Sequence, residues 1–513
     1  MTRTGEQAAV GLRSQRGPVL IAVMLSTGLV ALDSTIIATA VPSIVTDLGG
    51  FAQYPWLFSI YLLTQAVTVP LYGKFADVLG RKPVMFFGIG VFLLGSVLCG
   101  FAWNMLSLIV FRGVQGIGAG AVLPISVTII GDIYSVQERA RVQGYTASVW
   151  GAASVLGPTL GGVFSEYLSW RWIFFVNVPV GALAVWMLAG HLHEQVVRRR
   201  HRIDAAGATL LTAGCTLLIL GLLEGGVSWA WASVPSAAVF ACAVLLVVAF
   251  VAVELRAAEP VLPMWVFRHR TLNGGNVSAL MVGVVLIGLS SYVPTFAQGV
   301  LHTGPLVAGF VLAAMSVGWP IASALSGRAY MRIGFRDTAA IGAVVLVAGA
   351  VACLLLPQHT HLIVLAGACF LVGAGLGLNS TPVLVALQSV VGWDRRGVVT
   401  GTNMFFRSMG SAVGAAVFGA IANTTLTDRF AHPPAGLSGH LPRSADATAL
   451  VLNHRSSETA AVGQYVRASL YQATHYVFAA LLVASALCLL AVLAMPRKTV
   501  ALDPTGTAAP PTP

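Results

Sequence analysis

GKFADVLGRK, residues 73–82, separates two long apolar runs of the chain. Apolar runs of about 20 residues, enough to cross a hydrocarbon core of about 30 Å as a helix, recur along nearly the whole sequence. Of the 513 residues, 57% are hydrophobic and 9% are charged, whereas soluble domains carry about 25% charged residues. Segments of about 10 residues with alternating polarity, typical of membrane barrels, do not appear. The composition therefore predicts an all-α polytopic membrane protein.

The positions of Lys and Arg predict the topology of these runs. The net charge is +11, but the basic residues stand in short clusters between apolar runs, as membrane topology requires, and no nucleic-acid partner is expected. With both termini in the cytoplasm, most of the 29 Lys and Arg fall in inner segments. We therefore predict two cytoplasmic termini and an even number of spans, namely 18–41, 55–73, 84–102, 105–130, 142–164, 171–190, 205–225, 235–255, 272–300, 305–327, 338–357, 362–391, 398–421 and 471–495.

An internal repeat predicts how the spans are grouped. The segments Gly73–Lys82 and Gly116–Gly120 have counterparts at Gly327–Arg336 and Gly373–Gly377, about 255 residues further on and in the same orientation. Parallel repeats of this kind indicate two related six-helix halves, with room for two further spans between them. The predicted units are a cytoplasmic N-terminus (1–17), a first six-helix bundle (18–190), a linker with two accessory helices (191–271), a second six-helix bundle (272–495) with a long outer loop (422–470), and a disordered cytoplasmic tail (496–513).

The decisive stretch itself suits a tight connection between two spans. Gly73 and Gly80 permit a sharp turn between closely packed helices. Arg81 and Lys82 hold the segment on the inner side, and Asp77 is suited to cap a helix start or to pair with an Arg. The alternative is that residues 73–82 form an ordinary inner loop whose basic residues only set the topology.

Two charged residues lie within predicted spans. Asp33 falls in the first span, where burial penalises an ionised carboxyl and makes it a reversible proton carrier. Arg112, followed by Gln115, falls in the fourth span and needs a partner or a wet cavity. The alternatives are a carboxyl that only packs against Ser or Thr, and a structural Arg paired with a neighbour.

The fifth span carries a pattern of small residues around a proline. Gly157 and Gly161 form a small-xxx-small face for close helix contact, and Pro158 interrupts the backbone ladder. The pattern, completed by Gly151 and Gly162, predicts a bent and closely packed helix that rocks against its neighbour.

Further residues are candidates for a cavity between the two halves. Arg407 is placed to pair with an acid across this cavity. Glu224 is either an interfacial residue or one that attracts a cation at the mouth of the cavity. An aromatic lining, or alternatively lipid-facing and packing roles, is expected of Trp56, Tyr61, Trp150, Phe405 and Phe406, with Gln115 beside them. The His pairs at 191 and 193 and at 359 and 361 lack further ligands, so no metal site is expected.

These motifs, in this order, resemble those of the major facilitator superfamily, and within it the fourteen-span drug:proton antiporters. The resemblance covers roughly residues 18–420 and implies two six-helix bundles with two additional central spans. It implies a conformational latch at Gly73, Asp77, Gly80, Arg81 and Lys82, and proton coupling at Asp33 and Arg112. It also implies an antiporter motif at Gly151, Gly157, Pro158, Gly161 and Gly162.

The function implied by the resemblance is proton-coupled export of small hydrophobic or cationic compounds, including antibiotics, by a monomer in the cytoplasmic membrane. The proton gradient would be the energy source, and no cofactor is expected because the Walker pattern is absent. Export of lipids, siderophores or an endogenous metabolite by the same fold is left open. A membrane enzyme is disfavoured because Asp33 has no catalytic partner nearby in sequence.

Overall fold

The chain folds almost entirely into helices. Over the described residues, the only other regular feature is an isolated bridge between Gly225 and Trp229. The computed structural model describes residues 11–12, 14–49, 56–194, 204–225, 229–257, 260, 262, 264–434 and 460–497. The prediction of an all-α protein is confirmed.

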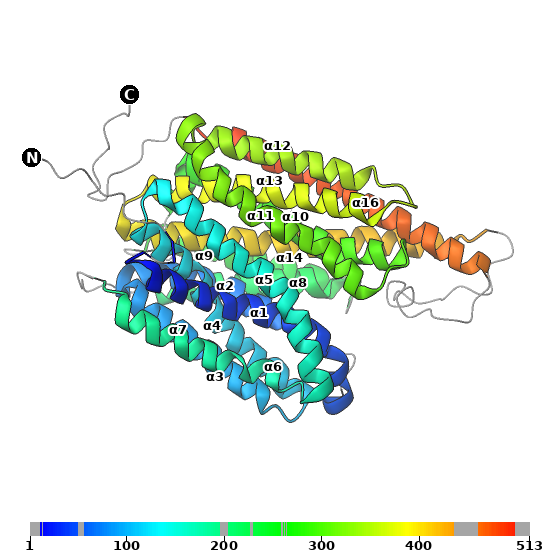
Figure 1. The fold of residues 1–513 in the computed structure, drawn as a ribbon, viewed down its shortest axis with the longest axis horizontal. Coiled ribbons are helices and arrows are strands. Elements are labelled where there is room, and N and C mark those ends of the chain that lie inside the picture. The colour runs from blue at the N-terminus through cyan, green and yellow to red at the C-terminus, as the bar shows by residue number, and fades with distance from the viewer. Residues whose placement is uncertain are drawn as a thin grey trace, which may run out of the picture.

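The first half of the chain forms one bundle of helices (Figure 1). Within it α1 packs against α5 and α7, and α4 packs against α2 and α3. The short α6 continues into α7, and together they make one span, Trp172–His191. The helices are α1 (Gly17–Leu48), α2 (Trp56–Leu79), α3 (Arg81–Gly100), α4 (Met105–Ile133), α5 (Val136–Tyr167), α6 (Trp172–Phe175) and α7 (Asn177–His191).

The second half forms a bundle of the same kind. Here α13 packs against α11 and α12, and α10 packs against α14 and α16. Short 3-10 turns η2 (Met264–Arg268) and η3 (Trp393–Arg395) precede α10 and α14. The helices are α10 (Arg270–Gly299), α11 (Pro305–Ile333), α12 (Phe335–Leu354), α13 (Leu362–Ser389), α14 (Arg396–Ala431) and α16 (Ala460–Leu493).

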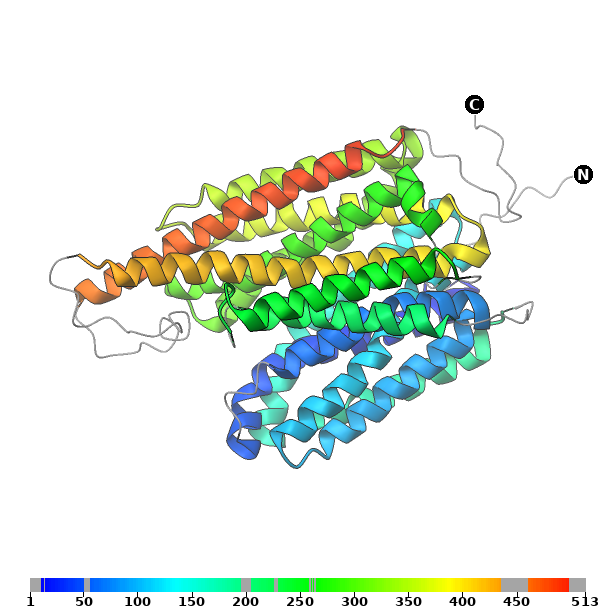
Figure 2. The same cartoon turned by 180° about the vertical axis from the view of Figure 1, so that it is seen from behind.

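Two accessory helices, α8 (Ala205–Glu224) and α9 (Val234–Glu254), join the bundles. In Figure 2 they lie along the seam between α2 and α14. α8 contacts both of these helices, and its residues Leu211, Cys215 and Ile219 share one apolar cluster with Val67 of α2 and Phe405 of α14. α9 packs on α8. The accessory pair therefore covers one of the seams between the bundles.

The helices account for fourteen spans in the described part of the chain. Eleven are long and apolar enough to cross a membrane by length and composition. The other three are α2, α5 and α8, whose hydropathy is lowered by polar or charged residues or whose apolar core, Ala206–Leu222, is short. α5, for example, begins with Glu138, Arg139 and Arg141. The sequence prediction of two six-helix bundles with two additional central spans is confirmed.

The repeat is visible in the backbone as well as in the sequence. Gly80 immediately precedes α3 with φ 97° and ψ 158°, and its counterpart Gly334 immediately precedes α12 with φ 89° and ψ 165°. This conformation is essentially restricted to glycine. The two halves therefore make the same sharp inner turn with the same residue.

The last predicted outer loop is shorter than expected. α14 continues to Ala431 and α16 begins at Ala460, so both ends of the predicted loop 422–470 are helical, while residues 435–459 lie outside the described part. Hydrogen bonds join the two helical extensions: Arg429 of α14 donates to Gln472 of α16, and Tyr465 donates to the Arg429 carbonyl. Pairing outside the hydrocarbon explains why the apolar pattern missed these turns. The predicted tail 496–513 also lies outside the described residues beyond Arg497.

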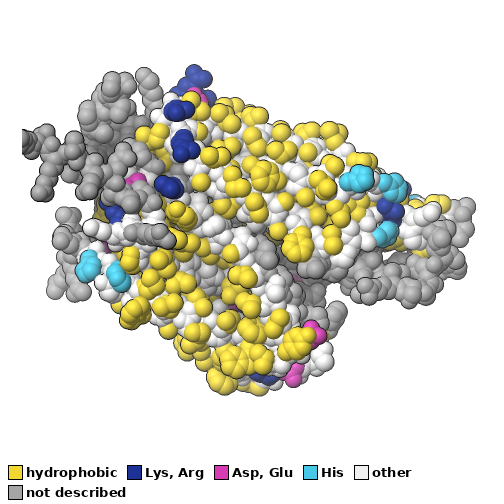
Figure 3. Space-filling view, viewed as in Figure 1, with side chains coloured by type: hydrophobic (Ala, Val, Ile, Leu, Met, Phe, Trp, Pro, Cys, Tyr) yellow, Lys and Arg dark blue, Asp and Glu magenta, His cyan; other side chains and the backbone are white. Residues whose placement is uncertain are grey.

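The surface has the character of a membrane protein. Hydrophobic side chains cover both bundles in Figure 3, and dark-blue Lys and Arg side chains gather mainly at the end near the two termini. That end holds the connections from α2 to α3 and from α11 to α12, and we call it the inner end. The opposite end is called the outer end.

Candidate functional site

Asp33 lies at the centre of a buried polar network in the first bundle. Both Asp33, on α1, and Arg112, on α4, are only 1% exposed. Arg112 Nη1 lies 2.5 Å from Asp33 Oδ2, so the two form an ion pair. Gln115, one turn after Arg112, donates from Nε2 to Asp33 Oδ1 at 2.7 Å and accepts from Arg112 Nη1 at 2.7 Å. The structure therefore brings together three residues that the sequence motifs singled out separately.

Arg112 has further partners from α2. Its Nε donates to the Leu57 carbonyl at 3.2 Å, and its guanidinium carbon lies 4.2 Å from the centre of the Tyr61 ring. A buried ion pair is tolerated only when its remaining hydrogen-bonding groups are satisfied, and these contacts meet that requirement. Tyr61 thus supports the ion pair with its ring.

Two other residues complete the network, and the motif analysis gave neither of them a role. Asn177, at the start of α7, donates to Asp33 Oδ1 at 3.2 Å and to Ser96 Oγ on α3 at 2.9 Å. Ser96 in turn accepts from Gln115 at 3.2 Å. The sequence signal for these two residues was a polar side chain inside an apolar run. Their shared place in the Asp33 network depends on the packing of helices that are distant in sequence. Asp33 is therefore held by α1, α4 and α7 together.

The electrostatics of this network depend on the charge of Asp33. When Asp33 is ionised, the pair with Arg112 is electrically neutral and all its contacts are charge-assisted. Adding a proton to Asp33 would remove the attraction and leave a buried guanidinium without its counter-ion, which is strongly unfavourable. The ion pair therefore links α1 to α4 through two buried opposite charges.

The small residues of α5 link this network to both bundles. A Cβ on Gly157 would overlap the hydroxyl of Thr35 on α1, and Thr35 donates to the Ala153 carbonyl of α5 at 3.0 Å. A Cβ on Gly151 would lie 3.0 Å from the Ser316 carbonyl of α11, in the second bundle. The predicted close packing thus occurs on two different faces of α5.

The other members of the α5 pattern differ in their surroundings. Gly161 is buried, whereas a Cβ on Gly162 would have nothing within 4 Å, so Gly162 is not a packing position. The side chain of Pro158 lies outside what the structure describes. The pattern is therefore a packing site at some of its glycines only.

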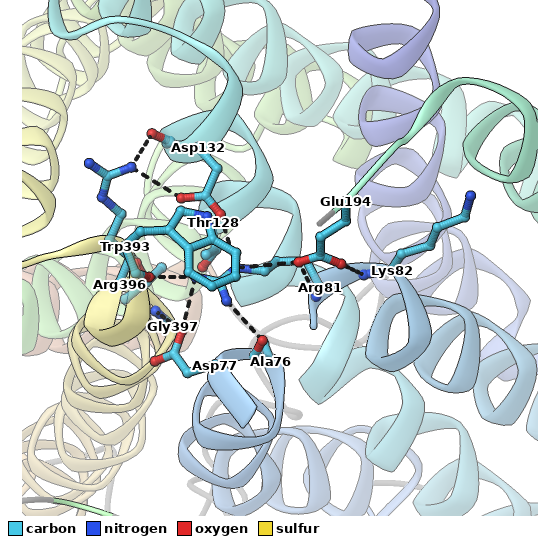
Figure 4. Close-up of polar contacts among 12 residues, drawn as sticks. Ala76, Asp77, Arg81, Lys82, Thr128, Asp132, Glu194, Trp393, Arg396 and Gly397 are labelled. Atoms are coloured by element: carbon cyan, nitrogen blue, oxygen red, sulfur yellow. Dashed lines mark hydrogen bonds and ion pairs between the residues drawn. The ribbon is translucent and has the colours of Figure 1, made fainter. Parts of the chain in front are cut away.

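The inner ends of the bundles are fastened by a second network, which we call the inner latch (Figure 4). Asp77 accepts hydrogen bonds from the backbone N–H groups of Gly397 and Val398, at 2.9 and 2.8 Å, at the start of α14. A carboxylate is favoured there because free N–H groups and the helix dipole both point toward it. Gly73 allows this approach, since a Cβ on it would lie 2.6 Å from the Gly397 carbonyl.

Arg81 is the centre of the inner latch. It is 2% exposed and forms ion pairs with Asp77 at 3.1 Å and Asp132 at 2.9 Å. It also donates to the Trp393 carbonyl at 2.7 Å, and its guanidinium carbon lies 3.8 Å from the centre of the Trp393 ring. From the second bundle, Arg396 pairs with Asp132 at 3.1 Å. Through Arg81 of α3, the latch joins α2, α3 and α4 of the first bundle to α14 of the second.

Asp132, Trp393 and Arg396 were not predicted members of the latch, and the predicted member Lys82 has another role. Lys82 Nζ donates to carbonyls at the end of α7, and Glu194 accepts from the backbone N–H groups of Arg81 and Lys82 at 2.8 and 3.0 Å. Each of the two side chains thus caps the neighbouring helix. The sequence signal for Asp132 was an acid at the inner end of an apolar run.

The remaining cavity candidates do not join the Asp33 network. Phe405 is buried in the apolar cluster with α2 and α8, and Phe406 packs edge-on against Phe405 and Phe267. Trp56 is half-buried at the start of α2, Trp150 is 39% exposed on α5, and Glu224 is half-buried at the end of α8. The four aromatic residues lie on several surfaces and do not line one common pocket.

Arg407 differs from its prediction. It is partly exposed on α14, and within the described residues it forms no ion pair with an acid across the cavity. Among the same residues no group of three or more His, Cys, Asp and Glu side chains is placed to hold a metal ion.

At the outer end, Asp47 fixes α1 to the start of α6. Arg171 donates to its carboxylate at 2.7 Å and the Trp170 indole donates at 3.0 Å. These hydrogen bonds hold the pKa of Asp47, which lies beyond the membrane-spanning part of α1, below its ordinary value. Asp47 therefore stays ionised at neutral pH.

Comparison with known proteins agrees with this architecture. Residues 23–415 match the model of the Major Facilitator Superfamily. The chain is 36% identical to the multidrug transporter protein MdtP of Bacillus subtilis strain 168, over 82% of this chain and 78% of that protein. It is 33% identical to multidrug resistance protein 3 of the same organism, over 85% of this chain and 84% of that protein.

A solved structure has the same fold. The human organic anion transporter MFSD10 (TETRAN) superposes with a TM-score of 0.61 at 14% identity, covering 92% of this chain and 99% of that chain. The family match, the two identities above 30% and the fourteen-span fold all agree, and the chain is a member of the major facilitator superfamily of membrane transporters.

Proposed function

We propose that this transporter exports small hydrophobic or cationic compounds, such as drugs and antibiotics, from the cytoplasm in exchange for protons. The observation that carries the proposal is the buried ion pair of Asp33 with Arg112, which gives the membrane core a carboxylate that can take up and release a proton. The relatives named as multidrug transporters support the choice of cargo.

The exchange cycle would use two conformations. The inner latch holds the inner end closed, and a proton entering from the outer side would reach Asp33 in this conformation. Protonation would release Arg112 and favour the return of the carrier to an inward-facing state, where substrate binds as the proton leaves. Each charge that crosses 100 mV contributes about 2.3 kcal/mol, so one proton supports about a 50-fold concentration gradient of an uncharged substrate.

The first test is ethidium efflux from energised cells that produce the parent chain or Asp33→Asn, with and without a protonophore. Asp47→Asn is the matched control, because it removes a carboxylate from the outer end of the same helix. Asp33→Glu keeps a titratable group at the site. All variants are compared at equal amounts in the membrane.

The proposal predicts that Asp33→Asn and the protonophore each abolish efflux, that Asp47→Asn leaves it nearly unchanged, and that Asp33→Glu keeps part of it. Efflux that survives Asp33→Asn would refute the coupling role of Asp33. A well-produced parent chain without ethidium efflux would contradict drug export and redirect the search to lipids or metabolites.

A further inference from the structure

One basic residue in the membrane core lies outside both networks. Arg407 stands on α14 about three turns after the helix begins at Arg396, which is about 16 Å along the axis. The inner latch fixes the start of α14 at the inner end, so Arg407 lies near the middle of a hydrocarbon core of about 30 Å. A guanidinium at that depth requires a counter-ion, hydrogen-bond acceptors or a wet cavity.

Arg407 belongs to a polar stripe on α14. At 3.6 residues per turn, the stripe occupies an arc of about 80° around the helix axis. Thr400 accepts from Gln388 of α13 at 3.0 Å, and Asn403 and Ser411 donate to carbonyls of α10 at 3.1 and 3.2 Å. The stripe consists of Thr400, Asn403, Arg407 and Ser411. It therefore faces the interior of the protein, not lipid.

Arg407 differs from the rest of the stripe in its side-chain contacts. In the described part of the chain its guanidinium has neither an ion pair nor a hydrogen bond, although the side chain is partly exposed. Arg112, in the first bundle, has an ion pair, two hydrogen bonds and an aromatic ring. The Asp33 carboxylate is already bound to Arg112, so it does not neutralise Arg407.

The neighbours of Arg407 show which space it adjoins. Its backbone packs against Gly283 of α10, where a Cβ would overlap the Arg407 carbonyl. Met404, which precedes it by nearly one turn, packs in the apolar cluster with Leu63 and Val67 of α2. Arg407 thus leaves α14 between α10 of the second bundle and α2 of the first. This is the seam along which the bundles move in the proposed transport cycle.

We propose that Arg407 is an anion-recognition group of the central cavity, and that the carrier accepts amphipathic organic anions and zwitterions through a carboxylate or sulfonate. A planar guanidinium binds such groups through two parallel hydrogen bonds. Met404 beside it is buried in the apolar cluster with α2, so the guanidinium has apolar surroundings on that side. This inference rests on the proposed function, because it treats the space between the bundles as the substrate path.

The test is equilibrium binding of three matched dansyl probes to the purified full chain in nanodiscs, followed by dansyl fluorescence. The probes share one fluorophore and differ in charge: dansylglycine carries a carboxylate, dansylglycinamide is neutral, and dansyl-ethylenediamine carries an ammonium group. Arg407→Gln removes the charge, and Arg407→Lys keeps it without the planar fork. Arg332→Gln is the matched control, because Arg332 is exposed at the inner end of α11.

We expect the parent chain to bind the carboxylate about tenfold more tightly than the amide, as for a charge-assisted hydrogen-bonded pair. Arg407→Gln is expected to remove this preference without changing amide binding, Arg407→Lys to retain part of it, and Arg332→Gln to retain all of it. A parent chain without preference for the carboxylate would overturn the inference. So would a loss of binding in Arg407→Gln that is equal for the three probes.

This experiment is independent of the test of the proposed function. Equilibrium binding requires no proton gradient, so dansylglycine binding through Arg407 can be observed even when Asp33→Asn leaves efflux unchanged. Conversely, ethidium export that depends on Asp33 stands when the probes show no charge preference. Melting temperatures of the variants show whether each has kept its fold.

Discussion

Tyr61 contributes to the Asp33 network through its ring, because its hydroxyl has no hydrogen-bond partner among the described residues. Tyr61→Phe is therefore expected to leave efflux and melting temperature nearly unchanged. Tyr61→Leu removes the cation–π contact with Arg112, worth about 2 kcal/mol at a desolvated site, and is expected to lower both. Thermal melting of the purified variants together with ethidium efflux measures the difference. Equal losses in the two variants would show that the hydroxyl, not the ring, matters.

Gly80 holds a backbone conformation that other residues rarely adopt. Gly80→Ala is expected to cost about 1–3 kcal/mol in stability, because φ 97° with ψ 158° is strained for any side chain. Gly90→Ala, in the exposed interior of α3 with nothing within 4 Å of a Cβ, is the control and is expected to be neutral or stabilising. Melting temperatures decide the comparison, and equal values for the two variants would contradict the strain at Gly80.

The sequence predicted which charged residues occupy the membrane core but not all of their partners. Asp33 and Arg112 were identifiable because charges inside apolar runs are rare. Asn177 and Ser96 were not, because a polar residue in a span has no preferred partner until distant helices pack. The position of Arg407 within a span was predictable, while an acid partner across the cavity is absent from the described contacts.

At the scale of the element, α5 packs tightly against α1 at Gly157 and leaves open space at Gly162. Gly157→Ala is expected to separate the two helices near Asp33, since its Cβ would lie 2.8 Å from the Thr35 Cβ as well as overlapping the hydroxyl. Overpacking of this kind costs about 1–3 kcal/mol. We expect a lower melting temperature and reduced efflux. Gly162→Ala, five residues further along the same helix, is expected to change neither, and equal effects would refute the packing role of Gly157.

The spans were predictable because the hydrocarbon core imposes a length and a composition on every crossing helix. The exact ends of the helices were less predictable. α14 and α16 continue beyond their apolar runs because Arg429 and Gln472 bind each other outside the core, and hydropathy carries no information on such a pairing. α2 and α5 were predicted in spite of their polar residues, because each keeps an apolar run of about 20 residues with a basic cluster at one end.

At the scale of the whole molecule, the inner latch joins the two bundles at the inner end. Asp77→Asn weakens the charge-assisted contact with the start of α14, worth about 1 kcal/mol, so the open-inside population is expected to rise about fivefold. Spin labels at Leu79 and Met331, which are exposed at the inner ends of the two bundles, report their separation. The labelled chain requires replacement of its six cysteines.

Asp337→Asn is the control for the latch experiment. Asp337 forms an exposed ion pair with Arg497 at 3.8 Å, away from the contacts between the bundles, and surface pairs of this kind contribute little. In Asp337→Asn the distances between the two spin labels are expected to match those of the parent chain. If Asp77→Asn also matches the parent, the carboxylate does not hold the inner end closed.

The assembly of the latch illustrates what a single sequence leaves undetermined. The stretch 73–82 predicted one side of it, since its glycines and charges are close together in the chain. The other side comes from Trp393 and Arg396, which only the docking of the second bundle brings near. Contacts between bundles also depend on the conformation, so no local pattern encodes them.

The accessory helices cover one side of the transporter, so the two seams between the bundles differ. α8 and α9 lie over the seam between α2 and α14, whereas α5 and α11 meet on another side of the molecule. A compound that approaches the α2–α14 seam from lipid would meet α8 and α9 before it reached the seam. On the other side α5 and α11 are themselves in contact, with Gly151 of α5 close to the Ser316 carbonyl of α11. The two seams between the bundles therefore present different surfaces to the lipid.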